Sequence, residues 1–191
     1  MTEPTESELV RAFCAGDSQA FGALVRLHQD TVFRVVRRYA RSADDARDLT
    51  QRAFLQAFEA AERSLPKLEG DVPFKAWLLR IAVNLAKNHV RDAGRWLLTS
   101  VDAVDRERPG NAAPHEALER AQSEAMTRRA VLELPPRQRE VFTLRIDAGL
   151  PFAEVASVLG ISEGNAKSHF HHAVKRLKEA VTKASSPGGV P

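Results

Sequence analysis

The sequence predicts an all-α protein of two helical domains joined by an acidic flexible linker, the second domain containing a helix-turn-helix. Ala, Leu, Arg and Glu dominate the composition, and residues that favour strands are sparse outside helical patterns. Apolar residues recur at intervals of three and four, which is the spacing of a buried helix face. Between two such regions, residues 99–125 are rich in acids and are broken by Pro and Gly. We therefore expect a first domain over residues 1–96, a linker over 97–121 and a second domain over 122–184.

The composition argues against a disulfide-stabilised, a secreted or a membrane-spanning protein. The 191 residues include 28 Lys and Arg and 25 Asp and Glu, a net charge of +3 that by itself does not select a partner. The single cysteine, Cys14, excludes an internal disulfide, and we expect it to pack as a small apolar residue between helices, with a redox sensor as the alternative. The polar, acidic N-terminus is unlike a signal peptide, and no apolar run approaches the ~20 residues of a membrane span. We expect a cytoplasmic protein without membrane insertion.

Capping signals mark the helices of the first domain. Thr5 and Glu8 form a capping-box pattern, and Asp17 and Ser42 are suited to cap the next two helices. In the third helix the residues expected to be buried are Ala46, Leu49, Ala53, Ala57 and Phe58. The polar residues Asp48, Gln51 and Arg52 are expected to face outward. A loop over residues 65–73 follows, marked by Pro and Gly.

Two parallel stripes run along residues 74–95. The apolar stripe consists of Phe74, Trp77, Leu78, Ile81, Ala82, Leu85 and His89. The second stripe contains only basic residues and amides: Arg80, Asn84, Lys87, Asn88, Arg91 and Arg95. A charge run is usually just a solvated face, but an ordinary surface mixes both signs and this stripe has no acid. We interpret it as a nucleic-acid surface whose amides contact bases or sugars. Trp77 is suited to stack on an unpaired base, although its place on the apolar stripe favours core packing.

A helix-turn-helix is predicted over residues 152–177. Apolar residues line the first helix, Gly160 permits the sharp turn, and Ser162 can cap the second helix. The second helix exposes Asn165, Lys167, Ser168, His169, His171, His172, Lys175 and Arg176. Asn and Lys bond base edges, while Lys, Arg and Ser hold phosphates. The alternative is a solvated face on a helical hairpin, but a turn centred on Gly with this outer face fits groove binding better.

The sequence contains no pattern of a catalytic or metal site. His169 and His172 lie one turn apart, but no nearby carboxylate or thiol completes a set of ligands, so no metal is expected. Their titration near neutral pH would tune DNA affinity only weakly. A Gly-rich phosphate loop and a nucleophile elbow are both missing from the sequence. We expect a protein without cofactor that is not an enzyme.

Taken in order, the segments resemble the bacterial sigma factors of the extracytoplasmic-function group. Residues 45–58 (DARDLTQRAFLQAF) resemble sigma region 2.2, and residues 74–88 (FKAWLLRIAVNLAKN) resemble regions 2.3 and 2.4. Residues 134–141 (LPPRQREV) and 153–168 (AEVASVLGISEGNAKS) resemble region 4. The acidic linker, with no third folded domain, matches this group. The resemblance covers nearly the whole chain.

This resemblance implies a factor that binds core RNA polymerase and directs initiation at promoters with −10 and −35 elements. The residues implied to dock on the clamp helices are Asp48, Gln51, Arg52 and Phe54, with a further contact to the polymerase flap. The residues implied for the −10 element are Leu68, Gly70 and Asp71, in a loop that receives a flipped base, and Arg80, Asn84, Lys87, Asn88 and Arg91. The residues implied for the −35 element are Ser162, Asn165, Lys167, Ser168, His169, His172 and Arg176. An anti-sigma factor is a further implied partner.

The sequence departs from the family pattern in two places. Arg52 stands where relatives usually carry Glu, which reverses one charge on the docking helix. Lys167, His169 and His172 stand where relatives often carry Arg, and neither Lys nor His offers a guanidinium fork for guanine. We therefore expect an atypical −35 sequence. The rival interpretations are a stand-alone helix-turn-helix regulator that needs no polymerase and a helical adaptor for protein partners.

Overall fold

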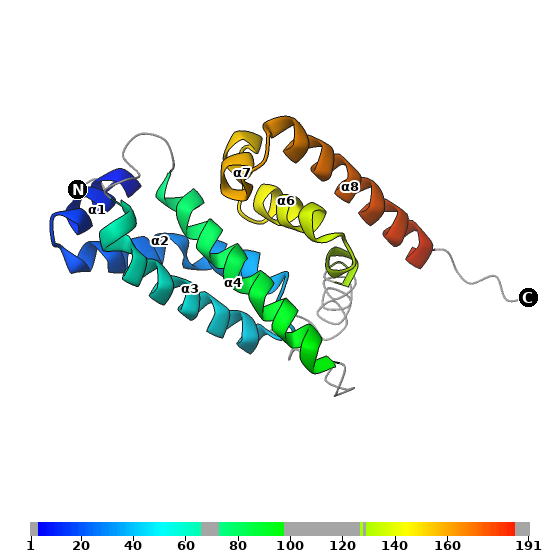
Figure 1. The fold of residues 1–191 in the computed structure, drawn as a ribbon, viewed down its shortest axis with the longest axis horizontal. Helices are drawn as coiled ribbons and strands as arrows, with labels where there is room; N and C mark the ends of the chain where they lie inside the picture. Colours follow the sequence, from blue (N-terminus) through cyan, green and yellow to red (C-terminus); the bar gives the residue numbers. More distant parts are fainter. Residues whose placement is uncertain (1–3, 66–72, 98–126, 128, 186–191) are drawn as a thin grey trace, which may run out of the picture.

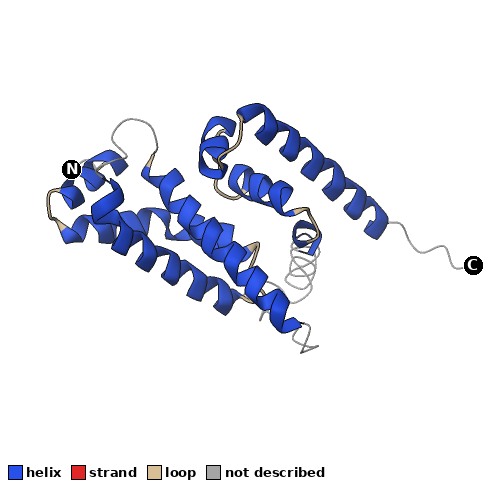
Figure 2. Cartoon of the chain, viewed as in Figure 1, coloured by secondary structure: helices blue, strands red, loops and turns tan. Residues whose placement is uncertain are grey.

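The computed structural model describes residues 4–65, 73–97, 127 and 129–185, and this part of the chain is helical with no strand (Figure 2). The N-terminal helices are α1 (Glu6–Cys14), α2 (Ser18–Arg37), α3 (Ala43–Ser64) and α4 (Phe74–Leu97). The C-terminal helices are α6 (Pro136–Ile146), α7 (Phe152–Leu159) and α8 (Glu163–Ser185). Figure 1 shows the two groups side by side, with α6 and α7 toward α4. The all-α class is confirmed; the expected linker, apart from Leu97, lies outside the described residues.

The first three helices begin where the capping signals predict. The Thr5 backbone N–H donates to the Glu8 carboxylate at 2.7 Å, and the Glu8 N–H donates to the Thr5 hydroxyl at 3.4 Å. Asp17 accepts from the Gln19 N–H at 2.9 Å, and Ser42 accepts from the Asp45 N–H at 3.0 Å. Each contact satisfies a backbone donor that has no partner inside its own helix.

The N-terminal helices share an apolar core closed at one end by aromatic rings. Leu24, Leu49 and Leu78 are fully buried where α2, α3 and α4 meet. The Phe21 ring centroid lies 5.3 Å from that of Phe13 on α1, and α1 is thereby held against the bundle. Trp77 is 9% exposed, so its predicted place in the core is confirmed.

Two expectations about burial were wrong. Cys14 is exposed at the end of α1, because Phe13, the residue before it, is the one that faces the core. On α3, Phe58 is 47% exposed, whereas Phe54 is only 8% exposed. Successive residues turn by about 100°, which places Phe54 nearer than Phe58 to the stripe of buried alanines on this helix. Phe58 therefore keeps one edge in solvent while it packs against Phe21.

The C-terminal helices form the predicted helix-turn-helix. Gly160 ends α7 in the left-handed conformation, with φ of +63°, and Ser162 accepts from the Asn165 N–H at 3.1 Å. Val155 of α7 and Ala166 of α8 are buried beneath the turn. The hydrophobic cluster of α2, α3 and α4 continues into α6 and α7, where α7 packs against α4. Of the described helices, none combines the length and apolarity needed to cross a bilayer.

Candidate functional site

The basic and amide stripe of α4 lies on the surface. Arg80, Asn84 and Lys87 are exposed, as are Asn88 and Arg91 one turn further on. The opposite side of α4 is buried at Leu78, Ala82 and Leu85, which fixes the stripe toward solvent. The predicted loop residues Leu68, Gly70 and Asp71 lie outside the described residues.

Two members of this stripe lie close to acidic side chains. The Lys87 ammonium lies 2.8 Å from a carboxylate oxygen of Glu140, a residue of α6. The Lys87 side chain stays 42% exposed, whereas that of Glu140 is only 3% exposed. Arg91 lies 3.5 Å from its exposed neighbour Asp92. The stripe is therefore accessible, but its positive charge is partly offset by acids close by.

The outer face of α8 carries most of the residues predicted to contact duplex DNA. Ser162, Asn165, Lys167, Ser168, His172 and Arg176 are exposed, whereas His169 is half-buried. The inner face of α8 is anchored by the fully buried Ala166 and Ala173. The Lys167 ammonium pairs with the Glu163 carboxylate one turn earlier at 2.7 Å, with both side chains about half exposed. Among the described residues, no group of three or more His, Cys, Asp or Glu could hold a metal ion.

An apolar groove lies between α2 and α3, beside the predicted docking residues. It has a volume of about 500 Å³ and is lined by Phe21, Val25, Gln29, Thr50, Gln51, Phe54, Leu55 and Phe58. Phe54 contributes to the groove from a buried position, and Asp48, Gln51 and Arg52 are exposed. The Arg52 guanidinium lies 3.6 Å from the Asp48 carboxylate one turn earlier, so the reversed charge is offset within the same helix.

Sequence reasoning missed the apolar part of this surface. Leu55 is 63% exposed, and Phe58 was expected in the core. The available signal was the position of Leu55, four residues after Gln51 on a face that is otherwise polar. An apolar residue at that position marks a candidate contact for a partner.

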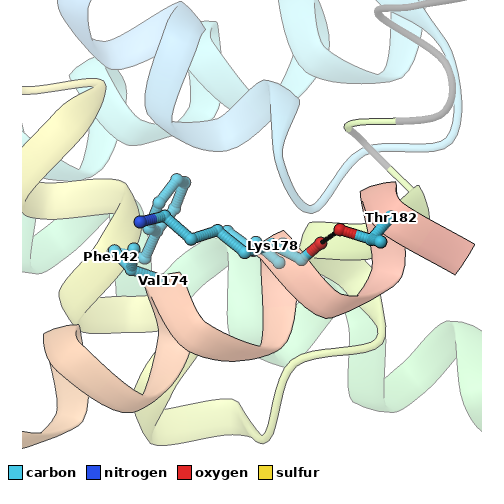
Figure 3. A pocket seen from close by; sticks show the side chains of 5 residues that line it. Phe142, Val174, Lys178 and Thr182 are labelled. Carbon is cyan, nitrogen blue, oxygen red and sulfur yellow. Dashed lines mark hydrogen bonds between the residues drawn. The ribbon is translucent and has the colours of Figure 1, made fainter. Parts of the chain in front are cut away.

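A second groove lies between α6 and α8. It has a volume of about 420 Å³ and is lined by Phe142, Val174, Leu177, Lys178 and Thr182. Figure 3 shows the Lys178 side chain extended along the groove, with Phe142 and Val174 near its ammonium end. The Thr182 hydroxyl donates to the Lys178 carbonyl at 2.9 Å. Val174 and Leu177 are partly open to solvent in this groove.

Comparison with known proteins identifies relatives along almost the whole chain. Residues 24–95 match the family model of sigma-70 region 2, and residues 124–177 match that of sigma-70 region 4. The RNA polymerase sigma-H factor of Pseudomonas aeruginosa is 32% identical, over 98% of this chain and 97% of its own. The ECF RNA polymerase sigma-E factor of Escherichia coli is 33% identical, over 96% and 95%. The solved structure of CnrH in complex with the cytosolic domain of CnrY is similar, with a TM-score of 0.66, 26% identity and coverage of 93% and 97%.

Proposed function

The chain belongs to the extracytoplasmic-function group of sigma-70 factors and directs transcription initiation, and we propose how its surfaces divide that work. In this proposal α4 contacts the opened −10 element, α8 reads the −35 duplex, and the groove between α2 and α3 receives core RNA polymerase. The observation that carries the proposal is the pair of exposed basic and amide surfaces on α4 and α8. Each surface lies in a segment matched by its own sigma region.

The chemistry of α4 suits strands that have been separated. Arg80, Lys87 and Arg91 supply charges for backbone phosphates, which position a strand without reading it. Asn84 and Asn88 supply amides that bond base edges, and these edges become fully available only when the bases are unpaired. We assign the loop residues Leu68, Gly70 and Asp71 to a pocket for one flipped base, in agreement with this preference for single strands.

The chemistry of α8 suits an intact major groove. Ser162 caps the helix, and its first turns present Asn165 and Lys167. The N-terminal residues of the second helix are the ones that contact bases in a helix-turn-helix. Ser168, His172 and Arg176 extend the same face, with His169 at its edge. Among these residues Arg176 alone has a guanidinium, so we expect single rather than forked hydrogen bonds to guanine over most of the site.

The groove between α2 and α3 has the character of a binding site for a helix of a partner. Leu55 and Phe58 offer apolar anchors, and the polar rim beside them consists of Asp48, Gln51 and Arg52. Interfaces commonly take their energy from such a buried apolar centre within a polar rim. We assign this face, with Phe54 beneath it, to the clamp helices of polymerase, and the C-terminal helices to the polymerase flap.

Two further assignments follow from membership of the family. CnrH is seen bound to the cytosolic domain of a second protein, and an anti-sigma factor that covers these same surfaces is the corresponding partner proposed here. We propose a non-catalytic, cytoplasmic factor, because polymerase performs the chemistry and works where the chromosome lies. The proposed domains span residues 1–96 and 122–184, with 97–121 as the linker between them.

Run-off transcription on fragmented genomic DNA tests the function directly. With core polymerase added, we expect RNA to begin at discrete sites that share two conserved elements. A stand-alone regulator would bind duplex DNA without polymerase and give no new start sites, and an adaptor would do neither. Replacement of both α4 amides, Asn84→Ala with Asn88→Ala, should lower initiation by about tenfold or more, because hydrogen bonds to bases are lost. Gln19→Ala, an exposed amide at the start of α2, is the matched control and should leave initiation unchanged.

A further inference from the structure

A forked ion pair joins the end of α2 to the end of α6. The Arg38 Nε donates to the two carboxylate oxygens of Asp147 at 3.2 and 3.0 Å, and Arg38 Nη2 donates to one of them at 2.8 Å. The Asp147 side chain is 8% exposed, so water competes weakly for it. Arg34 Nε also donates to the Asp147 backbone carbonyl at 3.3 Å. Charge-assisted contacts of this geometry are stronger and more directional than neutral hydrogen bonds.

The pair between Lys87 and Glu140 crosses the same boundary. One oxygen of Glu140 faces Lys87 of α4 at 2.8 Å, and the other lies 2.8 Å from Arg137 of its own helix. A carboxylate buried to this degree is costly unless it is paired. The packed arrangement thus supplies Glu140 with a second cation, and that cation belongs to the proposed −10 surface.

Tyr39 is buried near the acidic members of both pairs, Glu140 and Asp147. It follows α2 and is 4% exposed, and the Arg139 guanidinium of α6 lies 5.9 Å from its ring centroid. Burial raises the pKa of the Tyr39 phenol, and the negative charge of Glu140 acts in the same direction. The contact between the N-terminal and C-terminal helices therefore combines a buried aromatic residue, a cation–π contact and ion pairs.

The packed arrangement is incompatible with reading both promoter elements at once. The −10 and −35 elements are separated by about 25 base pairs, which is roughly 85 Å of B-form duplex. In the packed arrangement α6 and α4 are joined by a contact of 2.8 Å, and the 23 residues of α8 span only about 35 Å. The two groups of helices must therefore separate before both elements are bound.

We propose that the contacts of Arg38 with Asp147 and of Lys87 with Glu140 form a latch that holds the free chain in an autoinhibited state. In this state the Glu140 carboxylate pairs with Lys87, where a promoter phosphate would otherwise bind. The outer face of α8 remains exposed, so the latch restrains the −10 surface selectively. This inference rests on the role proposed for α4. The experiments below distinguish a failure of the latch from a failure of the proposed function.

The conformational arm uses the full chain without DNA or polymerase. Spin labels on the exposed native Cys14 and on Glu179→Cys in α8 report the distance between the two groups of helices. We expect a short, narrow distance distribution in the native chain and a rise of about tenfold in the long-distance population with Asp147→Asn.

Charge-swapped variants test whether the ion pair itself holds the chain closed. Arg38→Glu should open the chain, and Arg38→Glu combined with Asp147→Arg should close it again. Asp44→Asn, the same substitution in the exposed Asp44–Arg47 pair of α3, is the control and should not open it.

The binding arm measures fluorescence anisotropy with a random-sequence single-stranded DNA of about 20 nucleotides. Asp147→Asn should bind this probe several-fold more tightly than the native chain, whereas Asp44→Asn and the charge-swapped pair should bind like the native chain. An unchanged distance distribution in Asp147→Asn overturns the latch, and opening without tighter binding overturns its inhibitory role. If the native chain drives run-off transcription but the latch variants stay closed, this inference alone fails. If no initiation occurs with core polymerase, the proposed function fails.

Discussion

Glu6 shows how one side chain ties together the end of the N-terminal helices nearest the start of α4. Its carboxylate lies 2.7 Å from Nε2 of His28 on α2, and it also accepts a hydrogen bond from the Lys75 backbone N–H. His28 is 5% exposed, and its ring centroid lies 5.6 Å from that of Phe74. Burial acts to raise the pKa of Glu6, but the hydrogen bond and charge of His28, together with Lys75, outweigh burial and leave this pKa below 4.5. α1 is thus held by a carboxylate that must stay ionised.

Glu6→Gln should therefore change the stability of the N-terminal helices in a pH-dependent way. Because the folded-state pKa of Glu6 is depressed, its ionised form contributes stability above the unfolded pKa near 4.5, and this contribution is lost as pH falls through the folded-state pKa. We expect the variant to be less stable than the native chain by about 1 kcal/mol at pH 6, after allowance for solvent around this half-buried carboxylate. Urea unfolding between about pH 6 and pH 3 should show this difference shrinking toward zero. A constant difference across the range would contradict the assignment. Glu59→Gln, an exposed carboxylate on α3, is the control.

At the scale of the helices, the features that could be predicted from the sequence are those that depend on residues close together along the chain. Thr5, Asp17, Ser42 and Ser162 cap the helices they were expected to cap, because a cap depends on residues within a few positions along the chain. The apolar stripe and the basic and amide stripe of α4 could also be predicted, because each depends only on the spacing of residues along one helix. The sequence could not predict that Phe54 is buried and Phe58 half-exposed. Both lie at the edge of the apolar face of α3, and their neighbours on α1 and α2 decide which ring is covered. Periodicity locates a helix face but leaves its edges undetermined.

The turn between α7 and α8 provides a matched pair of glycines. Gly160 has φ of +63°, whereas Gly164 lies in the first turn of α8, and a Cβ at either position would meet nothing within 4 Å. Gly160→Ala should lower the free energy of unfolding by about 1 kcal/mol, because the left-handed conformation is unfavourable for residues with a Cβ. Gly164→Ala should raise it by up to about 1 kcal/mol, because alanine has the higher helix propensity. Urea unfolding of the two variants separates backbone strain from crowding. The explanation is wrong if both substitutions act in the same direction.

At the scale of the whole molecule, the contact between the N-terminal and C-terminal helices was beyond sequence reasoning. Arg38 and Asp147 are 109 positions apart, and neither has a pattern in its neighbourhood that indicates its partner. Glu140 is a charged residue, yet it is only 2% exposed. Pairing over such separations is decided by the packing of whole helices. The sequence predicted two binding surfaces, and the structure adds the contact that we propose restrains one of them.

The covalent connection between the two groups of helices should itself contribute to activity. Two weak contacts on one chain act together because the second forms at a high effective concentration, which is commonly in the millimolar range for short linkers. We expect that a protease site inserted within residues 98–114, and then cut, lowers initiation at nanomolar protein by about a hundredfold or more. The latch cannot replace the lost connection, because promoter elements roughly 85 Å apart require the two groups of helices to be separated. Run-off transcription with core polymerase measures the loss, and the uncut protein with the same insertion is the control. Raising the concentration of both fragments should restore part of the activity. Full activity of the cut protein at nanomolar concentration would show that each surface binds its element tightly enough alone.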